Sequence, residues 1–200
     1  MRDDGAMPLS LDEVHDLIDS WEIDPDVDTV VPAVDLFAAM AVGDPGRLDV
    51  LHVIADHRAM RGEVDAALAF LDQAGPTGHD DAEVLRAMRV SYLVGSGRGD
   101  ETEPLLDELR RRGPRLPAEA IERIADALEE AGRLQEAMRW FTIGLRELDP
   151  QQDLPAYEEE YALIGRSRVR RALDLPPDHY DVLARETLDA RRTRWTDDGD

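Results

Sequence analysis

The sequence of 200 residues contains no cysteine, no lysine and no asparagine. The absence of cysteine excludes disulfides, thiolate nucleophiles and zinc sites with thiolate ligands. No apolar run approaches the roughly 20 residues that a membrane-spanning helix needs, and the acidic amino terminus lacks the charged and apolar regions of a secretory signal. We therefore expect a cytoplasmic protein without a membrane partner, whose stability comes from side-chain packing.

The charge is strongly acidic, with a formal net charge of -22, and all 23 basic residues are arginines. Two origins explain this combination: a high-GC genome, which favours arginine codons over lysine codons, or a saline cytoplasm, which favours acidic surfaces. A negative field repels nucleic acids and anionic lipids and attracts basic molecules. The charge therefore favours a basic partner.

Apolar residues recur at helical spacing between glycine and proline breaks, which predicts an all-α chain of about ten helices. Ser10 is the predicted cap of the first helix, and Asp12 and Glu13 lie in its first turn, where the helix dipole favours acids. The expected helices cover residues 11–21, 33–42, 48–61, 64–74, 80–95, 101–112, 118–131, 134–148, 155–173 and 178–194.

The stretch 117–150 has the pattern of a complete helical hairpin. Ala125 and Ala137 are small residues placed where two helices touch, and Gly132 makes the turn between them. This order resembles the tetratricopeptide repeat (TPR) of roughly 34 residues, although aliphatic residues replace the family's tryptophan and tyrosine. The resemblance implies a TPR-like right-handed solenoid of helical hairpins. Such a scaffold binds a partner and needs neither a cofactor nor catalysis.

The same pattern recurs 35 residues earlier and again 35 residues before that, so that Gly62, Gly97 and Gly132 share one register. The middle copy is degenerate, because Arg86 stands where an apolar residue is expected. An irregular helical bundle is the alternative interpretation. Three further registers repeat: Ala55, Val90 and Ala125; Ala67, Thr102 and Ala137; Leu71, Leu106 and Phe141.

The expected organisation is one continuous domain. Residues 1–45 form an amino-terminal helical pair with an acidic loop, and residues 46–150 form the three TPR-like repeats. Residues 151–194 form the carboxy-terminal capping helices, and residues 195–200 are a frayed tail.

In the tetratricopeptide family, the first helix of each unit presents one face to a concave groove. The resemblance places acidic residues on this face in the first and third units, with a weakly polar floor of Val84, Ala87, Ser91, Val94 and Gly95 in the middle unit. The hypothesis is a non-enzymatic scaffold that binds a basic peptide or protein segment. The alternative is a solvated face without a binding role. The candidate contact residues are Asp49, His52, Asp56, Glu119, Glu122, Asp126, Glu129 and Glu130.

The densest basic patch lies near the carboxy terminus. The sequence around it is similar to the carboxy-terminal region of actinobacterial proteins that elsewhere carry a zinc-binding SEC-C motif, which is absent here because the chain lacks cysteine. Pairing of the arginines with acids nearby in sequence, Glu158, Glu159, Glu160 and Asp174, is the favoured interpretation. A nucleic-acid-linked regulator, acting through this patch, is the alternative function. Self-association of the chain is a further alternative. The patch consists of Arg166, Arg168, Arg170 and Arg171.

Residues 24–35 partly match a calcium-binding loop, through Asp24, Asp26, Asp28 and Asp35. The glycine that permits the sharp turn is missing, so a plain acidic loop without metal is expected.

The chain shows no convincing catalytic motif. His52 and His57 are five residues apart and diverge on a helix, whereas metal-binding pairs usually lie four apart. The glycine-rich segment 95–100 lacks the lysine and hydroxyl of a phosphate loop and fits a turn instead. An enzyme is therefore the weakest of the three function classes.

Overall fold

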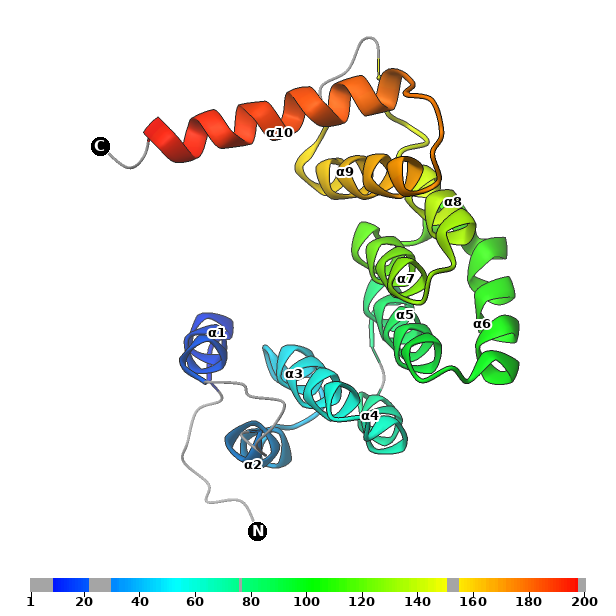
Figure 1. The fold of residues 1–200 in the computed structure, drawn as a ribbon. Helices are drawn as coiled ribbons and strands as arrows, with labels where there is room; N and C mark the ends of the chain where they lie inside the picture. Colours follow the sequence, from blue (N-terminus) through cyan, green and yellow to red (C-terminus); the bar gives the residue numbers. More distant parts are fainter. Residues whose placement is uncertain (1–8, 22–29, 76, 151–154, 198–200) are drawn as a thin grey trace. The chain divides into compact units, whose positions relative to one another are not determined.

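The computed structural model describes residues 9–21, 30–75, 77–150 and 155–197. Within these ranges the chain forms ten α-helices, one short 3₁₀ helix and no strand (Figure 1). The prediction of an all-α chain of about ten helices is therefore confirmed. The chain divides into two compact units, Met1–Gly78 and His79–Asp200, with the boundary inside the segment expected to hold the repeats.

The first unit is organised around its third helix. It contains α1 (Leu11–Ser20), α2 (Val31–Ala39), α3 (Arg47–Met60) and α4 (Val64–Leu71). Helix α3 contacts each of the other three helices. Its apolar face supplies the centre of the core, where Val50, Leu51, Ile54 and Ala55 are fully buried.

Local sequence signals set the starts of the first two helices. The Ser10 hydroxyl accepts the backbone N–H of Glu13 at 3.3 Å, and the Glu13 carboxylate accepts the N–H of Ser10 at 2.8 Å. This reciprocal capping box confirms Ser10 as the cap of α1. Helix α2 begins at Val31, earlier than expected, because Pro32 is favourable in a first turn, where a backbone N–H has no helical partner.

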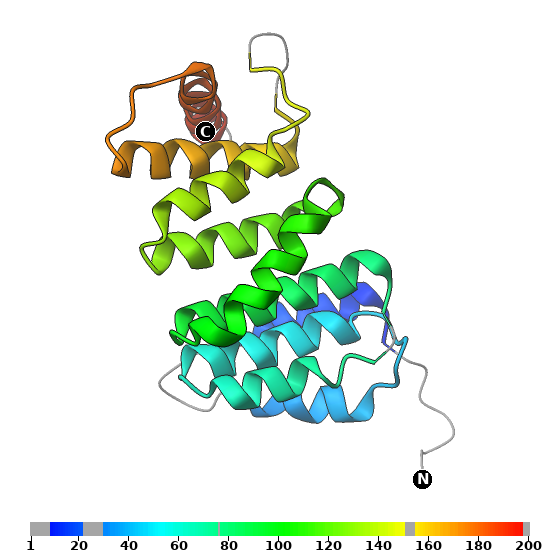
Figure 2. The same ribbon diagram turned by 90° about the vertical axis from the view of Figure 1, so that its right-hand side faces the viewer.

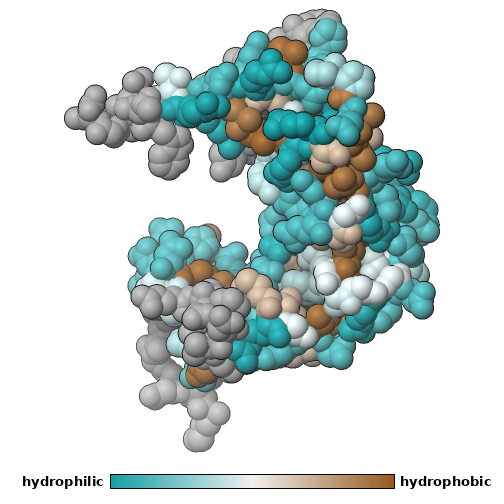
Figure 3. Space-filling model, viewed as in Figure 1, coloured by the Kyte–Doolittle hydropathy of each residue, from teal (hydrophilic) through white to brown (hydrophobic). Residues whose placement is uncertain are grey.

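The second unit stacks its helices in pairs. Helices α5, α7 and α9 lie side by side, α6 contacts α5, α8 lies against both α7 and α9, and α10 packs on α9 (Figures 1 and 2). Hydrophilic residues cover most of the visible surface, and apolar residues show mainly between the helices (Figure 3). The elements are α5 (His79–Gly95), α6 (Gly99–Arg112), the 3₁₀ helix η1 (Gly113–Arg115), α7 (Ala118–Glu130), α8 (Leu134–Gly144), α9 (Tyr157–Ala172) and α10 (His179–Asp197).

Three helix ends share one turn geometry. Gly62, Gly97 and Gly132 have φ angles of +76°, +73° and +74°, in the left-handed region that side chains disfavour. The residue after each glycine donates its N–H to the carbonyl five residues back, at 2.8–2.9 Å. This is the Schellman arrangement that closes a helix. The glycines found in one sequence register therefore perform the same structural task.

The other repeated positions also share one environment. Ala55, Val90 and Ala125 are fully buried, and so are Ala67 and Ala137. The remaining members, Thr102, Leu71, Leu106 and Phe141, are at most 5% exposed. Recurrent spacing in the sequence thus identified helix-packing positions in both units.

The degenerate middle segment is held by a buried ion pair. Glu83 on α5 is only 1% exposed, and its carboxylate contacts Arg112 on α6. Arg86, which the repeat pattern expected to be apolar, donates to the same carboxylate at 2.8 Å. Because two guanidinium groups meet one buried carboxylate, charge replaces part of the apolar contact between α5 and α6.

Candidate functional site

Arg168 joins the acidic face of α7 to α9. Its Nε and Nη2 atoms donate to the two carboxylate oxygens of Glu129, each at 2.7 Å, and Nη2 also contacts Asp126 at 3.3 Å. The hydrogen bonds with Glu129 raise the pKa of Arg168 above its ordinary value. A bidentate pair of this kind is stronger and more directional than a single ionic contact. Two candidate contact residues, Asp126 and Glu129, therefore already hold a guanidinium group.

Tyr161 completes this cluster. Its hydroxyl group donates to Asp126 at 2.5 Å, and burial together with this hydrogen bond raises the pKa of Tyr161 to about 12. Sequence reasoning did not identify Tyr161 as a site residue. A signal was available, because Tyr161 follows Asp126 by 35 residues, the period of the repeat.

The acidic face of α7 and the basic patch of α9 are thus parts of one surface. In the sequence they are separate candidate sites for opposite kinds of partner. The ion pair between Arg168 and Glu129 neutralises part of the negative charge of α7 and part of the positive charge of α9. Glu119 and Glu130 remain exposed on α7. Glu122 lines a cavity.

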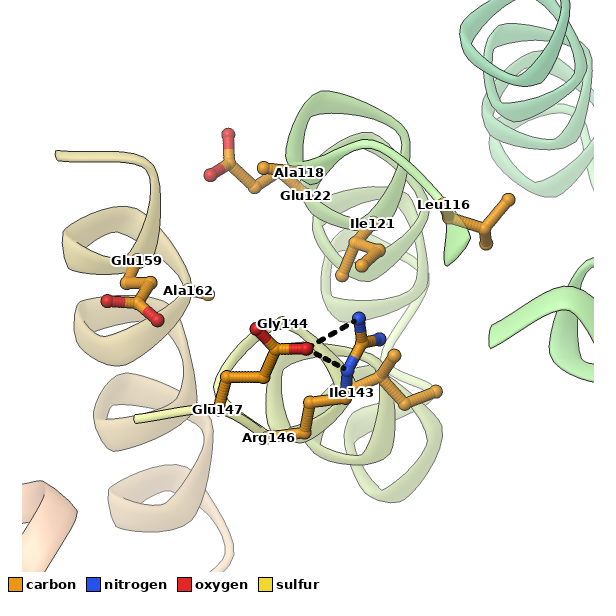
Figure 4. A pocket seen from close by; sticks show the side chains of 10 residues that line it. All are labelled: Leu116, Ala118, Ile121, Glu122, Ile143, Gly144, Arg146, Glu147, Glu159 and Ala162. Atoms are coloured by element: carbon orange, nitrogen blue, oxygen red, sulfur yellow. Dashed lines mark hydrogen bonds and ion pairs between the residues drawn. The ribbon is translucent and has the colours of Figure 1, made fainter. Parts of the chain in front are cut away.

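That cavity has a volume of about 120 Å³ and lies between α7, α8 and α9 (Figure 4). Buried Ile121, Leu116 and Ala162 form much of its apolar lining. Close approach of α8 and α9 shapes one wall, where a Cβ on Gly144 would lie 3.1 Å from that of Ala162. The cavity has room for one side chain and is well below the roughly 300 Å³ of the smallest usual ligand pockets.

Three glutamates surround this apolar space, and each comes from a different segment. Glu122 projects from α7, Glu147 from the turn after α8 and Glu159 from α9 (Figure 4). Glu159 accepts the N–H of Ala156 at 2.8 Å, which fixes it at the start of α9. Arg146 meets Glu147 at 3.3 Å in an exposed pair. The residues that line the cavity include three carboxylates and one guanidinium group, and Glu122 has a further interaction within the protein.

Three of the four carboxy-terminal arginines are paired within the unit. Besides Arg168, Arg166 forms two hydrogen bonds with Asp178, at 3.1 and 2.8 Å, and stacks over Tyr180. Arg170 donates to Asp181 at 3.0 Å. Arg171 is exposed and has no ion pair in the described part of the chain.

The partners of these arginines differ from those expected. Acids close in sequence were favoured, but Glu160 bonds Arg191 at 2.6 Å and Glu159 caps α9. The side chain of Glu158 lies outside the described residues. The arginines instead reach α7 and the start of α10, because packing of helices brings those acids closer than helical neighbours. Of the four arginines in the nucleic-acid hypothesis, Arg166, Arg168 and Arg170 are therefore paired with acids, and Arg171 alone has no ion pair among the described residues.

The candidates in the first unit lie on α3. Asp49 contacts His15 of α1 at 3.3 Å, and both side chains are about half exposed. His52 and Asp56 each have further interactions within the protein. The face of α3 is therefore engaged by neighbouring groups.

The expected floor of the middle unit is largely core. Val84 is 6% exposed, Ala87 is fully buried and Val94 is 8% exposed. The expectation that these residues line an open groove is therefore wrong, because α5 packs this side against its neighbours. Ser91 bonds the carbonyl of Met88 at 2.8 Å, and only Gly95 is exposed.

Three residues of the possible calcium loop, Asp24, Asp26 and Asp28, lie outside the described residues, and Asp35 lies in α2. Among the residues that are described, no three His, Asp or Glu side chains converge as metal ligands. His57 is fully buried and His52 lies on the same helix. In the same ranges, no helix has the length and apolarity needed to cross a bilayer.

Comparisons with protein-family models, curated proteins and solved structures found no match to this chain.

Proposed function

We propose that this chain is a non-enzymatic scaffold, a tetratricopeptide-like right-handed solenoid, that binds a basic segment of a partner protein. The repeated turn at Gly62, Gly97 and Gly132 supports a repeat architecture. The packing of α5, α7 and α9 side by side also supports it, as does the contact of α8 with both α7 and α9. In such an array each hairpin stabilises the next, and a rigid surface results.

The cavity between α7, α8 and α9 is the observation that carries the proposal. Its apolar lining and its rim of Glu122, Glu147 and Glu159 suit a side chain that has an aliphatic stem and a cationic end. Arginine and lysine are the side chains with this composition. A volume of about 120 Å³ fits one such side chain. The net charge of -22 adds a long-range attraction for a basic segment.

The mechanism is preorganisation. Glu159 is fixed by its bond to Ala156, and Ile121 and Ala162 are buried by helix packing. The scaffold therefore loses little freedom on binding, and the cost falls mainly on the partner segment. Asp126 and Glu129 contribute to the negative field, but a direct contact with either requires that Arg168 move aside.

A random peptide display library, selected on the purified chain, tests this proposal. We expect selected peptides to share an arginine or lysine beside apolar residues. Glu122→Gln combined with Glu147→Gln should weaken binding of a selected peptide by about tenfold or more, because charge-assisted hydrogen bonds are lost. Fluorescence anisotropy of the labelled peptide at low and moderate salt measures the change.

A control with equal loss of charge is Asp100→Asn combined with Glu186→Gln. Both residues are exposed and lie on α6 and α10, outside the cavity. This variant should bind within about twofold of the unmodified chain, since distant exposed charges are largely screened. Selection of acidic peptides, or equal weakening in both variants, would refute the cavity as the site.

A further inference from the structure

A second cavity lies between α9 and α10, and its charge is opposite to that of the protein as a whole. Its volume is about 290 Å³, near the lower end of the roughly 300–1,000 Å³ typical of small-molecule sites. Four arginines and one aspartate, Asp181, are its charged lining residues. In a chain of net charge -22, this is a local concentration of positive charge.

Two of the four arginines have no ion pair with any residue that the structure describes. Arg168 is held by Glu129, and Arg170 is held by Asp181, so these guanidinium groups are compensated. Arg171 from α9 and Arg185 from α10 are exposed and form no ion pair in the described ranges. The two helices thus place on one cavity two guanidinium groups that no described carboxylate neutralises.

The same cavity has an apolar part. Leu175 and Leu188 line it and are 38% and 37% exposed, although most leucines in this unit are buried. Ile164 and Ala184 extend the apolar lining from α9 and α10. Apolar residues are visible between these helices in Figure 3. Burial of the exposed leucine surface by a ligand would be favourable.

We propose that this cavity binds a small amphiphilic anion, in which a carboxylate or phosphate head is carried on a short aliphatic body. Arg171 and Arg185 hold the head, because a guanidinium group presents paired donors that match the oxygens of either anion. Leu175 and Leu188 cover the aliphatic body. The site is separate from the glutamate-rimmed cavity and does not depend on the basic-segment proposal.

Isothermal titration calorimetry with octanoate at low salt tests the proposal. Octyl phosphate tests the alternative head, acetate lacks the aliphatic body, and octanol lacks the charge. Octanoate or octyl phosphate should bind at least about tenfold more tightly than acetate or octanol, since both parts of the site contribute. The tighter of the two anions identifies the head group that the site prefers.

Arg171→Ala combined with Arg185→Ala should weaken octanoate binding by about tenfold or more. The matched control is Arg111→Ala combined with Arg115→Ala, which removes two exposed arginines elsewhere in the unit and should leave affinity unchanged. Leu188→Ala should weaken octanoate but not acetate. Circular dichroism verifies the folding of each variant.

Equal affinity of the two double variants for octanoate, or no binding of either octyl anion, would overturn the proposal. Binding of an acidic, leucine-containing peptide at Arg171 and Arg185, without binding of the octyl anions, would also overturn it, in favour of a peptide site.

Discussion

At the scale of single residues, the most consequential group is the cluster of Arg168, Glu129, Asp126 and Tyr161. It links two neighbouring helices through one bidentate ion pair and one short hydrogen bond. The guanidinium group of Arg168 contacts the carboxylates of Asp126 and Glu129, which would otherwise face solvent. A direct contact of the proposed basic segment with these carboxylates would require displacement of this internal guanidinium group.

Tyr161 gives this cluster a titration signature. Its pKa is raised to about 12 in the folded protein, whereas an unfolded tyrosine titrates near 10. The contribution to stability is therefore fully present below pH about 10 and is lost as the pH rises through about 12. Ultraviolet absorbance of tyrosinate, compared between the unmodified chain and Tyr161→Phe, isolates this transition.

Asp126→Asn serves as the companion variant for that titration. Removal of the carboxylate should move the pKa of Tyr161 back towards its ordinary value, because a neutral amide no longer disfavours the phenolate. A Tyr161 transition near the ordinary pKa in the unmodified chain would show that the hydrogen bond does not form in solution.

At this scale the sequence predicted which residues are candidates but not which of them contact each other. The acids Asp126 and Glu129 and the cation Arg168 were all identified as charged candidates, but their contact was not predicted. Pairing over 39 residues depends on how α7 and α9 pack, and helical spacing within one segment carries no information on it. The prediction that the arginines pair with acids nearby in sequence was inaccurate for the same reason.

At the scale of helices and turns, sequence reasoning was more successful. Three glycines at one period predicted three turns, and each adopts a positive φ. Boundaries were less accurate: the helix expected over 134–148 ends at Gly144, because buried Leu145 and Leu148 continue the core in a turn. Apolar spacing cannot distinguish a last helical turn from a packed loop.

Helix α9 approaches α8 closely at Gly165, which leads to a prediction about stability. A Cβ on Gly165 would lie 2.5 Å from the ring of Phe141, which is fully buried. Gly165→Ala should therefore lower the free energy of unfolding by about 1–2 kcal/mol, because overpacking outweighs the gain in helix propensity. Chemical denaturation measures the change.

Gly95→Ala is the control for this substitution. Gly95 ends α5, and a Cβ there would meet no atom within 4 Å. This variant should be neutral or more stable by about 0.5–1 kcal/mol, since only the propensity gain remains. Stabilisation by Gly165→Ala would contradict the close packing of α8 against α9.

Helix α6 should be the salt-sensitive element of the second unit. Ion pairs tie it to its neighbours: Arg112 contacts Glu83 on α5, and Arg110 contacts Glu136 on α8 at 2.6 Å. Arg133 meets Glu103 of α6 at 2.7 Å. A cavity of about 490 Å³ lies between these charged groups, so apolar contact with α8 is limited.

Hydrogen exchange of backbone amides at low and high salt tests whether salt weakens the attachment of α6. Protection of α6 should fall by roughly three- to tenfold in high salt, because the Arg110–Glu136 and Arg133–Glu103 pairs are partly exposed. Exposed ion pairs contribute up to about 1 kcal/mol each and are screened by salt. Protection of α7, whose Ile124, Ala125 and Leu128 are fully buried, should change little. An equal response of both helices would mean that packing, not charge, holds α6.

At the scale of the whole molecule, the total charge and the local charges differ. The chain has a net charge of -22, and its second unit combines a glutamate-rimmed cavity with a separate arginine-lined one. The total charge did not predict these local differences, because the sum over the sequence does not say where charges compensate each other. The all-α class followed from the sequence, whereas both cavities required the packing of α7 to α10.

Chemical-shift mapping by nuclear magnetic resonance tests the central proposal most directly. The isotope-labelled chain is titrated with a basic peptide selected from the display library. The account predicts that the largest shifts fall on backbone amides around Glu122, Gly144 and Ala162, on three different helices that line one cavity. Shifts confined to α1–α4, or centred on Arg171 and Arg185, would contradict it.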